Sequence, residues 1–290
     1  MAALLVLALL GFLLISTETM PAGIRSQIAD GMATSEGVVG QLVSAYALGT
    51  VLFTIPAIVL TRGFSRKKLF LIGIAAFLLA NTITAVSSDV ALSLVSRFIA
   101  GGLFGMLWGM FGGYTVRMTP PTLIGRALSL VAAGAPVGIA FGTPLGTALG
   151  KTFGWRWSFG GLAILTVVVV LAALFLRDAR GQPASARMPL AGVFRTPGVA
   201  AILAVIFVWM LGNSTACTYI TPYLSAAGSG VSVEILLLVF GIASIGGIAL
   251  TAVFIDRYPR ILVSTCLAVF AVAGVILVVA GVLAGREFSG

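Results

Sequence analysis

The sequence predicts an all-α membrane protein, from its composition and from the spacing of its charges. Apolar residues make up 60% of the 290 residues and charged residues only 9%, whereas ordinary soluble domains have roughly 45–50% and about 25%. Seventeen Lys and Arg outnumber eight Asp and Glu. These basic residues lie in short clusters between long uncharged runs, so the excess positive charge indicates the lipid bilayer as the partner and no nucleic acid.

Nine charge-poor runs are long enough to cross a bilayer as helices. About 20 apolar residues are needed, because a rise of about 1.5 Å per residue must cover a hydrocarbon core of about 30 Å. The runs are Ala2 to Ile24, Gly37 to Thr61, Leu69 to Ser88, Ala91 to Val116, Ala127 to Gly150, Trp157 to Leu176, Thr196 to Pro222, Ile235 to Ile255, and Ile261 to Gly285. A cleaved signal peptide is the alternative for the first run, but that run lacks a basic start and continues into Glu18 and Arg25.

The basic residues alternate between the two sides of the predicted membrane domain. Twelve lie in the loops after the second, fourth, sixth and eighth runs, four lie on the other side, and Arg97 lies inside a run. Because cytoplasmic loops carry the excess of Lys and Arg, the N-terminus is predicted to be cytoplasmic. Trp155 and Trp157 flank Arg156 on the opposite side, as residues at a membrane interface would.

A polar stretch and a repeated turn predict the domain organisation. Residues 177–196 hold the long polar stretch and predict a cytoplasmic linker between a six-span bundle, 1–176, and a partial three-span bundle, 197–290. A tight basic turn begins at Thr61 and again at Asp256, and the same offset of 195 residues places Asn213 opposite Glu18. Two halves repeated in parallel are a transporter architecture, with the solute site near the midplane.

The ordered motifs of the chain resemble those of the major facilitator superfamily. They are the short basic turn after the second run, Arg97 early in the fourth run, and a fifth run rich in Gly and Pro. The stretches from Glu18 to Gly49 and from Gly142 to Phe159 are similar to bacterial twelve-span drug:proton antiporters and sugar-efflux permeases, including arabinose-efflux and chloramphenicol-resistance-like proteins. This resemblance implies a multi-pass protein of the inner cell membrane. Thr61, where the family has an acid, and an end after nine spans depart from the pattern.

Two ionisable residues lie within the predicted spans and are candidates for proton coupling. Glu18 is the carboxylate and Arg97 the cation, and each is disfavoured in a bilayer by about 2.5–3.5 kcal/mol unless it faces an aqueous cavity or a partner. Resemblance implies that Arg97 transfers a proton or orients the coupling carboxylate. The alternatives are that Glu18 reaches the external surface near Pro21 and that Arg97 only bonds to backbone carbonyls of a neighbouring helix.

Glycines recur at every fourth residue of the fourth and fifth runs, and two prolines interrupt the fifth. In a helix this spacing makes a flat ridge on which another backbone can approach closely, and each proline removes a backbone donor and bends the helix. Resemblance implies that this kinked segment seals one half against the other; plain helix packing is the alternative. The kink and packing residues are Gly134, Pro136, Gly138, Gly142, Pro144 and Gly146.

Two further sets of residues complete the predicted site. The basic turns would latch the cytoplasmic side during alternating access, unless their charges only fix topology; this cytoplasmic gate comprises Arg62, Gly63, Arg66, Lys67, Asp256 and Arg257. In the second turn Asp256 can pair with a nearby Arg, whereas in the first Thr61 cannot. Aromatic and polar side chains suit an amphiphilic solute, and the predicted cavity residues are Tyr46, Phe104, Trp108, Tyr114, Asn213 and Tyr219.

These features favour a secondary transporter that exports a small drug-like or sugar-like solute in exchange for protons, with no cofactor besides the proton gradient. An enzyme is not expected: the sequence has no His and no phosphate-binding motif, and Cys217 and Cys266 lie in apolar runs, where thiols act as small hydrophobes rather than metal ligands. The alternative is a truncated fragment that inserts but does not transport. Because about three spans would be missing, we expect the 290 residues alone to be inactive; the oligomeric state is left open, a monomer included.

Overall fold

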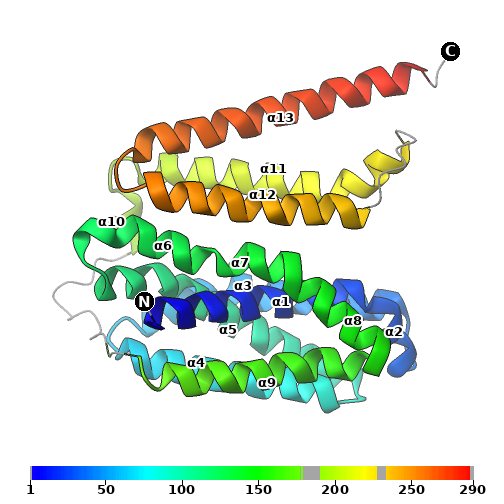
Figure 1. The fold of residues 1–290 in the computed structure, drawn as a ribbon. Coiled ribbons are helices and arrows are strands. Elements are labelled where there is room, and N and C mark those ends of the chain that lie inside the picture. Colours follow the sequence, from blue (N-terminus) through cyan, green and yellow to red (C-terminus); the bar gives the residue numbers. More distant parts are fainter. Residues whose placement is uncertain (1, 177, 179–189, 227–232, 288–290) are drawn as a thin grey trace. The chain divides into compact units, whose positions relative to one another are not determined.

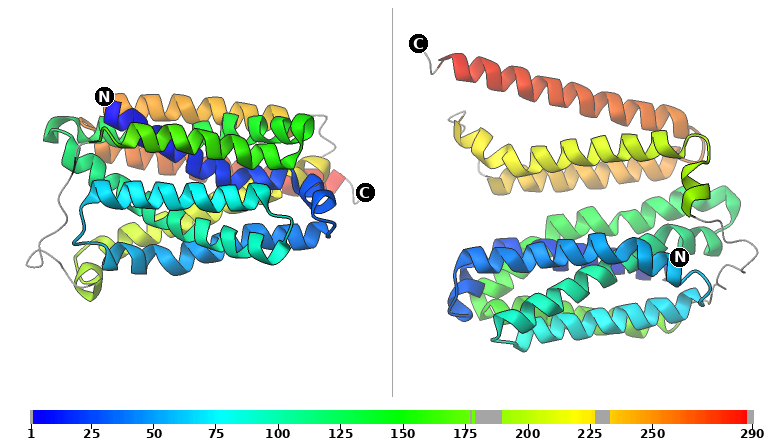
Figure 2. Two further views of the ribbon diagram at one scale, coloured as in Figure 1. Left: turned by 90° about the horizontal axis from the view of Figure 1, so that it is seen from below. Right: turned by 180° about the vertical axis from the view of Figure 1, so that it is seen from behind.

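The computed structural model describes residues 2–176, 178, 190–226 and 233–287, and these ranges contain helices and no β-strand. The chain divides into two compact units, residues 1–182 with 240–257 and residues 183–239 with 258–290. Figures 1 and 2 show the helices of each unit.

The helices of the first part of the chain are α1 (Ala2–Gly23), α2 (Arg25–Gly31), α3 (Glu36–Leu60), α4 (Arg66–Val86), α5 (Val90–Met118), η1 (Pro121–Leu123), α6 (Ile124–Ala132), α7 (Gly134–Val137), η2 (Gly138–Gly142), α8 (Thr143–Phe153) and α9 (Trp155–Ala173). Those of the remainder are α10 (Leu190–Phe194), α11 (Val199–Ala226), α12 (Val233–Phe254) and α13 (Pro259–Glu287).

Each of the nine predicted spans coincides with a helix or, for the fifth, with the run of short helices from Pro121 to Phe153. Within the described residues, seven of these segments are long and apolar enough to cross a membrane. The described apolar stretches of α11 and α12 are shorter, Val199–Asn213 and Val239–Phe254. The sequence did not predict the short helices α2 and α10, because neither carries a long apolar run.

Polar side chains at the helix starts fix where three of the spans begin. Ser35 accepts a hydrogen bond from the Val38 N–H at the start of α3, Ser65 from the Lys68 N–H at the start of α4, and Asp89 from the Leu92 N–H at the start of α5. Each of these side chains satisfies one of the backbone donors that a helix N-terminus leaves without a partner.

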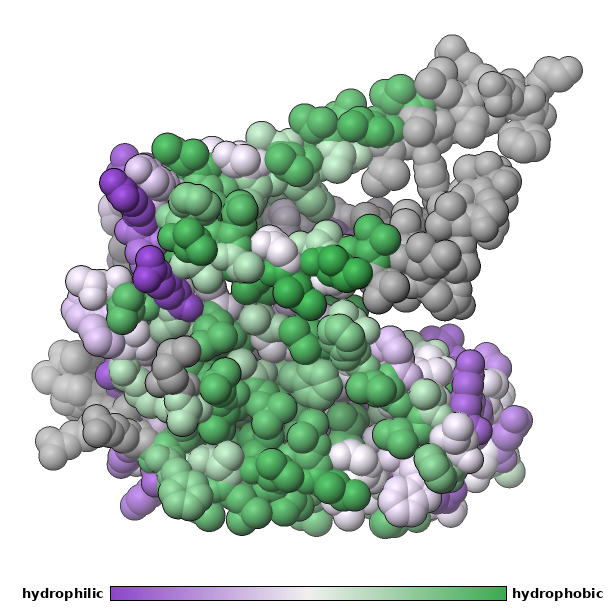
Figure 3. All heavy atoms as spheres, viewed as in Figure 1, coloured by the Kyte–Doolittle hydropathy of each residue, from purple (hydrophilic) through white to green (hydrophobic). Residues whose placement is uncertain are grey.

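The first unit is a bundle in which α5 packs against both α3 and α4, and α4 also packs against α9. Figure 3 shows apolar side chains over the middle of this bundle and hydrophilic ones gathered toward its ends. Exposed apolar side chains such as Leu48, Leu52 and Ile55 cover the outer face of α3. An apolar outer surface with paired backbone groups is what a bilayer requires of a helical protein.

The fifth span is interrupted where the sequence places its two prolines. Pro136 lies in the four-residue helix α7, the following segment η2 is a π-helical turn, and Pro144 lies in the first turn of α8. A proline lacks the N–H that the regular ladder needs, and π-turns are a usual cause of bends in long helices.

The glycine ridge of the fifth span faces α1 along most of its length. A methyl group added at Gly134, Gly138, Gly142, Gly146 or Gly150 would meet Ala8, Phe12, Ser16, Met20 or Ile24, respectively. Both series advance by four residues, so the fifth span follows α1 closely, against its backbone carbonyls at Gly134 and Gly138 and against its side chains farther along. The comparable ridge of α5 faces α3: Gly101 lies against the Tyr46 carbonyl, Gly105 against Thr54 and Gly109 against Ile58.

In the second unit, α11 and α13 contact each other through aromatic side chains. The rings of Trp209 and Phe270 are 6.2 Å apart at 51°, and a methyl group at Gly212 would lie 3.1 Å from the Phe270 ring. Residues 240–254 of α12 group with the first unit, where Gly241 lies against Ala140 of η2.

Candidate functional site

Arg97 is buried between four helices of the first unit. Its side chain is 1% exposed, and its Nη2 donates a hydrogen bond of 3.0 Å to the Thr17 carbonyl of α1. The guanidinium carbon lies 4.5 Å from the ring centroid of Tyr46 on α3 and 5.7 Å from that of Phe159 on α9. The Nε and Nη1 groups find no hydrogen-bond acceptor, so Arg97 keeps donors to spare in a buried site.

Glu18 is the next residue in sequence after Thr17, whose carbonyl accepts the hydrogen bond from Arg97. Its side chain is partly exposed, and it interacts electrostatically with Arg97 and Tyr46, but no ion pair within 4.0 Å joins Glu18 to Arg97. The bond from Arg97 to the Thr17 carbonyl is the kind that a purely structural role predicts. That role does not explain the two unpartnered donors, because a buried donor without an acceptor costs about 1–3 kcal/mol.

The turn of α1 that carries Glu18 is held against the irregular part of the fifth span. The hydroxyls of Thr19 and Thr143 are 2.6 Å apart, and the Ser16 hydroxyl donates to the Phe12 carbonyl at 2.7 Å and lies 3.5 Å from the Gly138 carbonyl. Ser16 also faces Gly142. The turn of α1 that contains Glu18 therefore contacts the irregular part of the fifth span through Ser16 and Thr19.

Three of the predicted cavity residues are buried in the first unit. Tyr46, Phe104 and Tyr114 are 1%, 8% and 1% exposed, while Trp108 is 37% exposed. Asn213 is partly exposed on α11, and the Tyr219 side chain lies outside the described part of the structure. Their role in binding solute stays a prediction.

An aromatic series runs along α5 from the charged site. Successive ring centroids lie 5.7 Å apart from Tyr46 to Phe104, 5.6 Å from Phe104 to Trp108 and 5.4 Å from Trp108 to Phe111. Phe70 of α4 extends the series, 6.1 Å from Phe111 and 5.0 Å from Tyr114. Sequence reasoning missed Phe111, although positions 104, 108 and 111 follow the spacing of one helix face.

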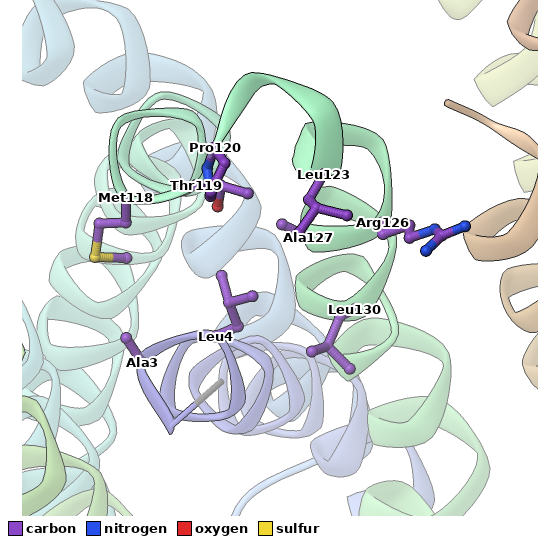
Figure 4. Close-up of a pocket in the computed structure, with 9 residues that line it drawn as sticks. All are labelled: Ala3, Leu4, Met118, Thr119, Pro120, Leu123, Arg126, Ala127 and Leu130. Carbon is purple, nitrogen blue, oxygen red and sulfur yellow. The ribbon is translucent and has the colours of Figure 1, made fainter. Parts of the chain in front are cut away.

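A separate apolar pocket of about 430 Å³ lies at the start of α1, the end of α5 and α6. Figure 4 shows Ala3 and Leu4 facing Met118 and Leu123 across it, with the Arg126 side chain extending away. None of the predicted cavity residues lines this pocket, and Glu18 lies several turns farther along α1.

The first basic turn has an acidic partner, Asp178, which does not lie in the turn itself. Asp178 accepts hydrogen bonds from the Ser65 hydroxyl at 2.6 Å and the Lys67 N–H at 3.4 Å, and the Lys67 ammonium donates to the Leu174 carbonyl at 2.6 Å. Thr61 instead bonds to the Ala57 carbonyl of its own helix. Folding brings the segment after α9 to the start of α4, a contact 113 residues apart in sequence that the sequence analysis did not predict.

Local geometry holds the rest of this turn together. The Arg66 guanidinium donates to the Arg62 carbonyl at 3.3 Å, and Gly63 lies in the turn that joins α3 to α4. The four predicted gate residues of the first turn are therefore close in space as well as in sequence.

In the second turn, Asp256 binds the start of α6. Its carboxylate accepts from the Gly125 N–H at 2.7 Å and the Arg126 N–H at 3.3 Å, and lies 3.7 Å from the Arg126 Nε. This partner is 130 residues away in sequence, whereas the sequence suggested an arginine near the turn itself. Arg257, the next residue in sequence, also interacts with other groups.

Comparisons with known proteins agree with this architecture. A purine ribonucleoside efflux pump, NepI, of Shigella dysenteriae serotype 1 (strain Sd197) is 26% identical over 271 residues, which are 92% of this chain and 69% of the pump. The solved proton:xylose symporter XylE matches with a TM-score of 0.60 and 16% identity, covering 89% of this chain and 69% of that one. The human organic anion transporter MFSD10 (TETRAN) matches with a TM-score of 0.66 and 14% identity, covering 88% of this chain and 72% of that one.

These structural neighbours share the fold of the chain at low identity. The apolar helices described above are those of a multi-pass membrane protein. The sequence profile of the Major Facilitator Superfamily, whose members are transporters and not enzymes, matches residues 7–285, nearly the whole chain. The chain therefore belongs to the Major Facilitator Superfamily of membrane transporters.

Proposed function

We propose that this transporter exports a small neutral or cationic amphiphilic solute in exchange for protons, by alternating access. Purine ribonucleosides are the first class to test, because a relative matched over 92% of the chain is a pump for that class. A ribonucleoside combines an apolar aromatic base with a sugar, which is the solute type that aromatic and polar side chains on an aliphatic wall would accept.

The observation that carries this proposal is Arg97, buried with two unpartnered donors beside Glu18. A proton-coupling carboxyl group must be desolvated in one state and stabilised as an anion in another. Glu18 would carry the proton, and the spare Arg97 donors would receive its carboxylate when the proton leaves. The sequence contains no His that could carry the proton instead.

The irregular fifth span and the cytoplasmic turns would supply the moving parts. Ser16 and Thr19, in the same turn of α1 as Glu18, contact the fifth span, so a shift of α1 on protonation of Glu18 would be passed to the fifth span through these two residues. Asp178 and Asp256 tie the first and second basic turns to helix starts, and these bonds would form and break at the cytoplasmic gate. No cofactor is part of the proposal.

The test is solute uptake by the purified 290-residue chain in vesicles that are acidic inside, and saturable uptake there would also contradict the expectation that these 290 residues alone are inactive. For a proton exchanger, tritiated inosine accumulates above its external concentration, saturably, and a protonophore abolishes the accumulation. Ethidium serves as a cationic drug-like probe in parallel. Glu18→Gln should remove the accumulation, whereas Glu36→Gln, at an exposed glutamate at the start of α3, should not.

Two results would contradict the proposal in different ways. Saturable uptake that the protonophore leaves unchanged would refute proton coupling. No uptake of either probe by correctly inserted protein would refute export of these solutes by this chain.

A further inference from the structure

Tyr46 occupies an unusual position for a residue expected to line a solute cavity. It is 1% exposed, and its hydroxyl has no hydrogen-bond partner. One neighbour of its ring is the Arg97 guanidinium, 4.5 Å from the centroid, and another is Phe104, 5.7 Å away at 54°. Arg97, Gly101 and Phe104 lie on one face of α5, so Tyr46 lies over the glycine between a cation and an aromatic ring.

The backbone holds Tyr46 in this position. The Tyr46 carbonyl lies against Gly101, where any side chain would collide with it, and accepts a hydrogen bond of 3.0 Å from Thr50. The Thr50 hydroxyl also lies 3.0 Å from the Gly101 carbonyl. This contact fixes the distance between α3 and α5 at the level of Arg97, so the Tyr46 backbone cannot move away from α5 without separating the helices.

The Tyr46 ring supplies the interaction that Glu18 does not supply in this conformation. Among the residues that the structure describes, no carboxylate lies within 4.0 Å of the Arg97 guanidinium, and a buried cation without a counter-charge is strongly disfavoured. The negative face of an aromatic ring attracts a guanidinium, and most strongly where water is excluded. The guanidinium carbon lies over the face of the ring, while the Nε and Nη1 donors have no partner among the described residues.

We propose that Tyr46 is a positioning residue for Arg97: its ring face holds the guanidinium in place while Glu18 is not bound, and leaves the edge donors open for the Glu18 carboxylate. This inference rests on the proposed function, because it assigns Tyr46 a part in proton coupling. It differs from a cavity role, in which Tyr46 would touch the solute. Around Arg97 the charged or titratable groups are Glu18 on α1 and Tyr46 on α3, and α9 contributes the Phe159 ring.

The test compares Tyr46→Phe, which keeps the ring face, with Tyr46→Leu, which removes it. In the inosine assay Tyr46→Leu should lower the kcat of gradient-driven uptake about tenfold or more, with a KM within about twofold of the wild type. Tyr46→Phe should retain wild-type values. Phe77→Leu, at a fully buried ring of α4 in the same core, measures the effect of lost packing alone and should leave the ratio of gradient-driven to exchange uptake unchanged.

Three results would overturn this assignment. A raised KM with unchanged kcat in Tyr46→Leu would make Tyr46 a solute-binding residue. Equal losses in Tyr46→Phe and Tyr46→Leu would shift the role to the hydroxyl. A loss of gradient-driven uptake in Phe77→Leu as selective as that in Tyr46→Leu would reduce the effect to packing.

A second readout does not depend on transport. Phenylglyoxal reacts with accessible arginines, and mass spectrometry of the purified protein measures modification at Arg97. Wild type and Tyr46→Phe should protect Arg97, whereas Tyr46→Leu should react about tenfold faster. Protection that persists in Tyr46→Leu would refute the positioning role, even if wild type transports neither probe and the proposed function itself fails.

Discussion

Charged groups in the first unit occur in two settings that differ in how completely they are paired. At the helix ends, Asp178 and Asp256 each accept at least two hydrogen bonds from the start of another helix. In the interior, Arg97 has one hydrogen bond to a backbone carbonyl and two donors without partners. The buried group, for which pairing matters most, is therefore the less completely paired.

This contrast separates a structural role from a functional one. A carboxylate at a helix start stabilises the helix by about 0.3–1 kcal/mol and loses little by facing water. An incompletely paired buried arginine lowers the stability of the protein. We expect such an arginine to have a function, with a second partner in another state of the transport cycle. Charge changes inside the bundle should therefore abolish transport, while equivalent changes at the ends should weaken the protein slightly.

The largest expected effect is that of Arg97→Lys. A lysine ammonium cannot reproduce the planar fork of the guanidinium or its stacking on Tyr46, so we expect gradient-driven inosine uptake to fall at least about a hundredfold. The matched control is Arg126→Lys, because the Arg126 side chain is 59% exposed and its ion pair is loose. Similar losses of uptake in both variants would show that buried and exposed arginines do not differ in their importance for transport.

The next effect concerns the close packing that holds the Glu18 turn. Gly134→Ala places a methyl group against the Ala8 carbonyl, so α1 must shift, and we expect a loss of about 1–3 kcal/mol in stability. Gly113→Ala is the control, since nothing lies within 4 Å of a methyl group there, and helix propensity favours alanine by about 1 kcal/mol. Thermal unfolding in detergent measures the stability of both variants. Equal unfolding midpoints would show that the glycine ridge can accept a methyl group without loss of stability.

The smallest effects are expected at the helix ends. Asp256→Asn removes the charge at the start of α6 and should lower stability by about 1 kcal/mol or less. Asp178→Asn should have a similarly small effect, because both aspartates are exposed. Unfolding midpoints of both variants at low and high salt check this prediction, since screening by salt should reduce the difference in stability from the wild type. A salt-independent loss of several kcal/mol would show that these carboxylates contribute as much to stability as a buried charged group.

Much of the fold could be predicted because span length and charge spacing are local properties of the sequence. The predicted run from Gly37 to Thr61 and the helix Glu36–Leu60 nearly coincide. The glycine period indicated a surface for close approach, but not that its partner in the fifth span is α1. That choice depends on which helices the bundle brings together.

The site was predictable as a set of residues and not as a geometry. Glu18 and Arg97 stand out because ionisable groups in spans are rare, but the sequence cannot show that Arg97 bonds to the Thr17 carbonyl and leaves Glu18 unbonded. Asp178 was missed because its partners Ser65 and Lys67 are more than 100 residues away. The acid was sought at Thr61, whose hydroxyl instead bonds within its own helix.

In the proposed mechanism, Glu18 carries the coupled proton while solute binding depends on other residues. The most direct measurement uses Glu18→Gln in vesicles under two conditions: inosine exchange with no gradient, and inosine uptake driven by an acidic interior. Because glutamine preserves the size of the side chain but cannot release a proton, exchange should stay within about twofold of the wild type and gradient-driven accumulation should disappear. Gradient-driven accumulation that persists in Glu18→Gln with the pH dependence of the wild type would contradict the claim.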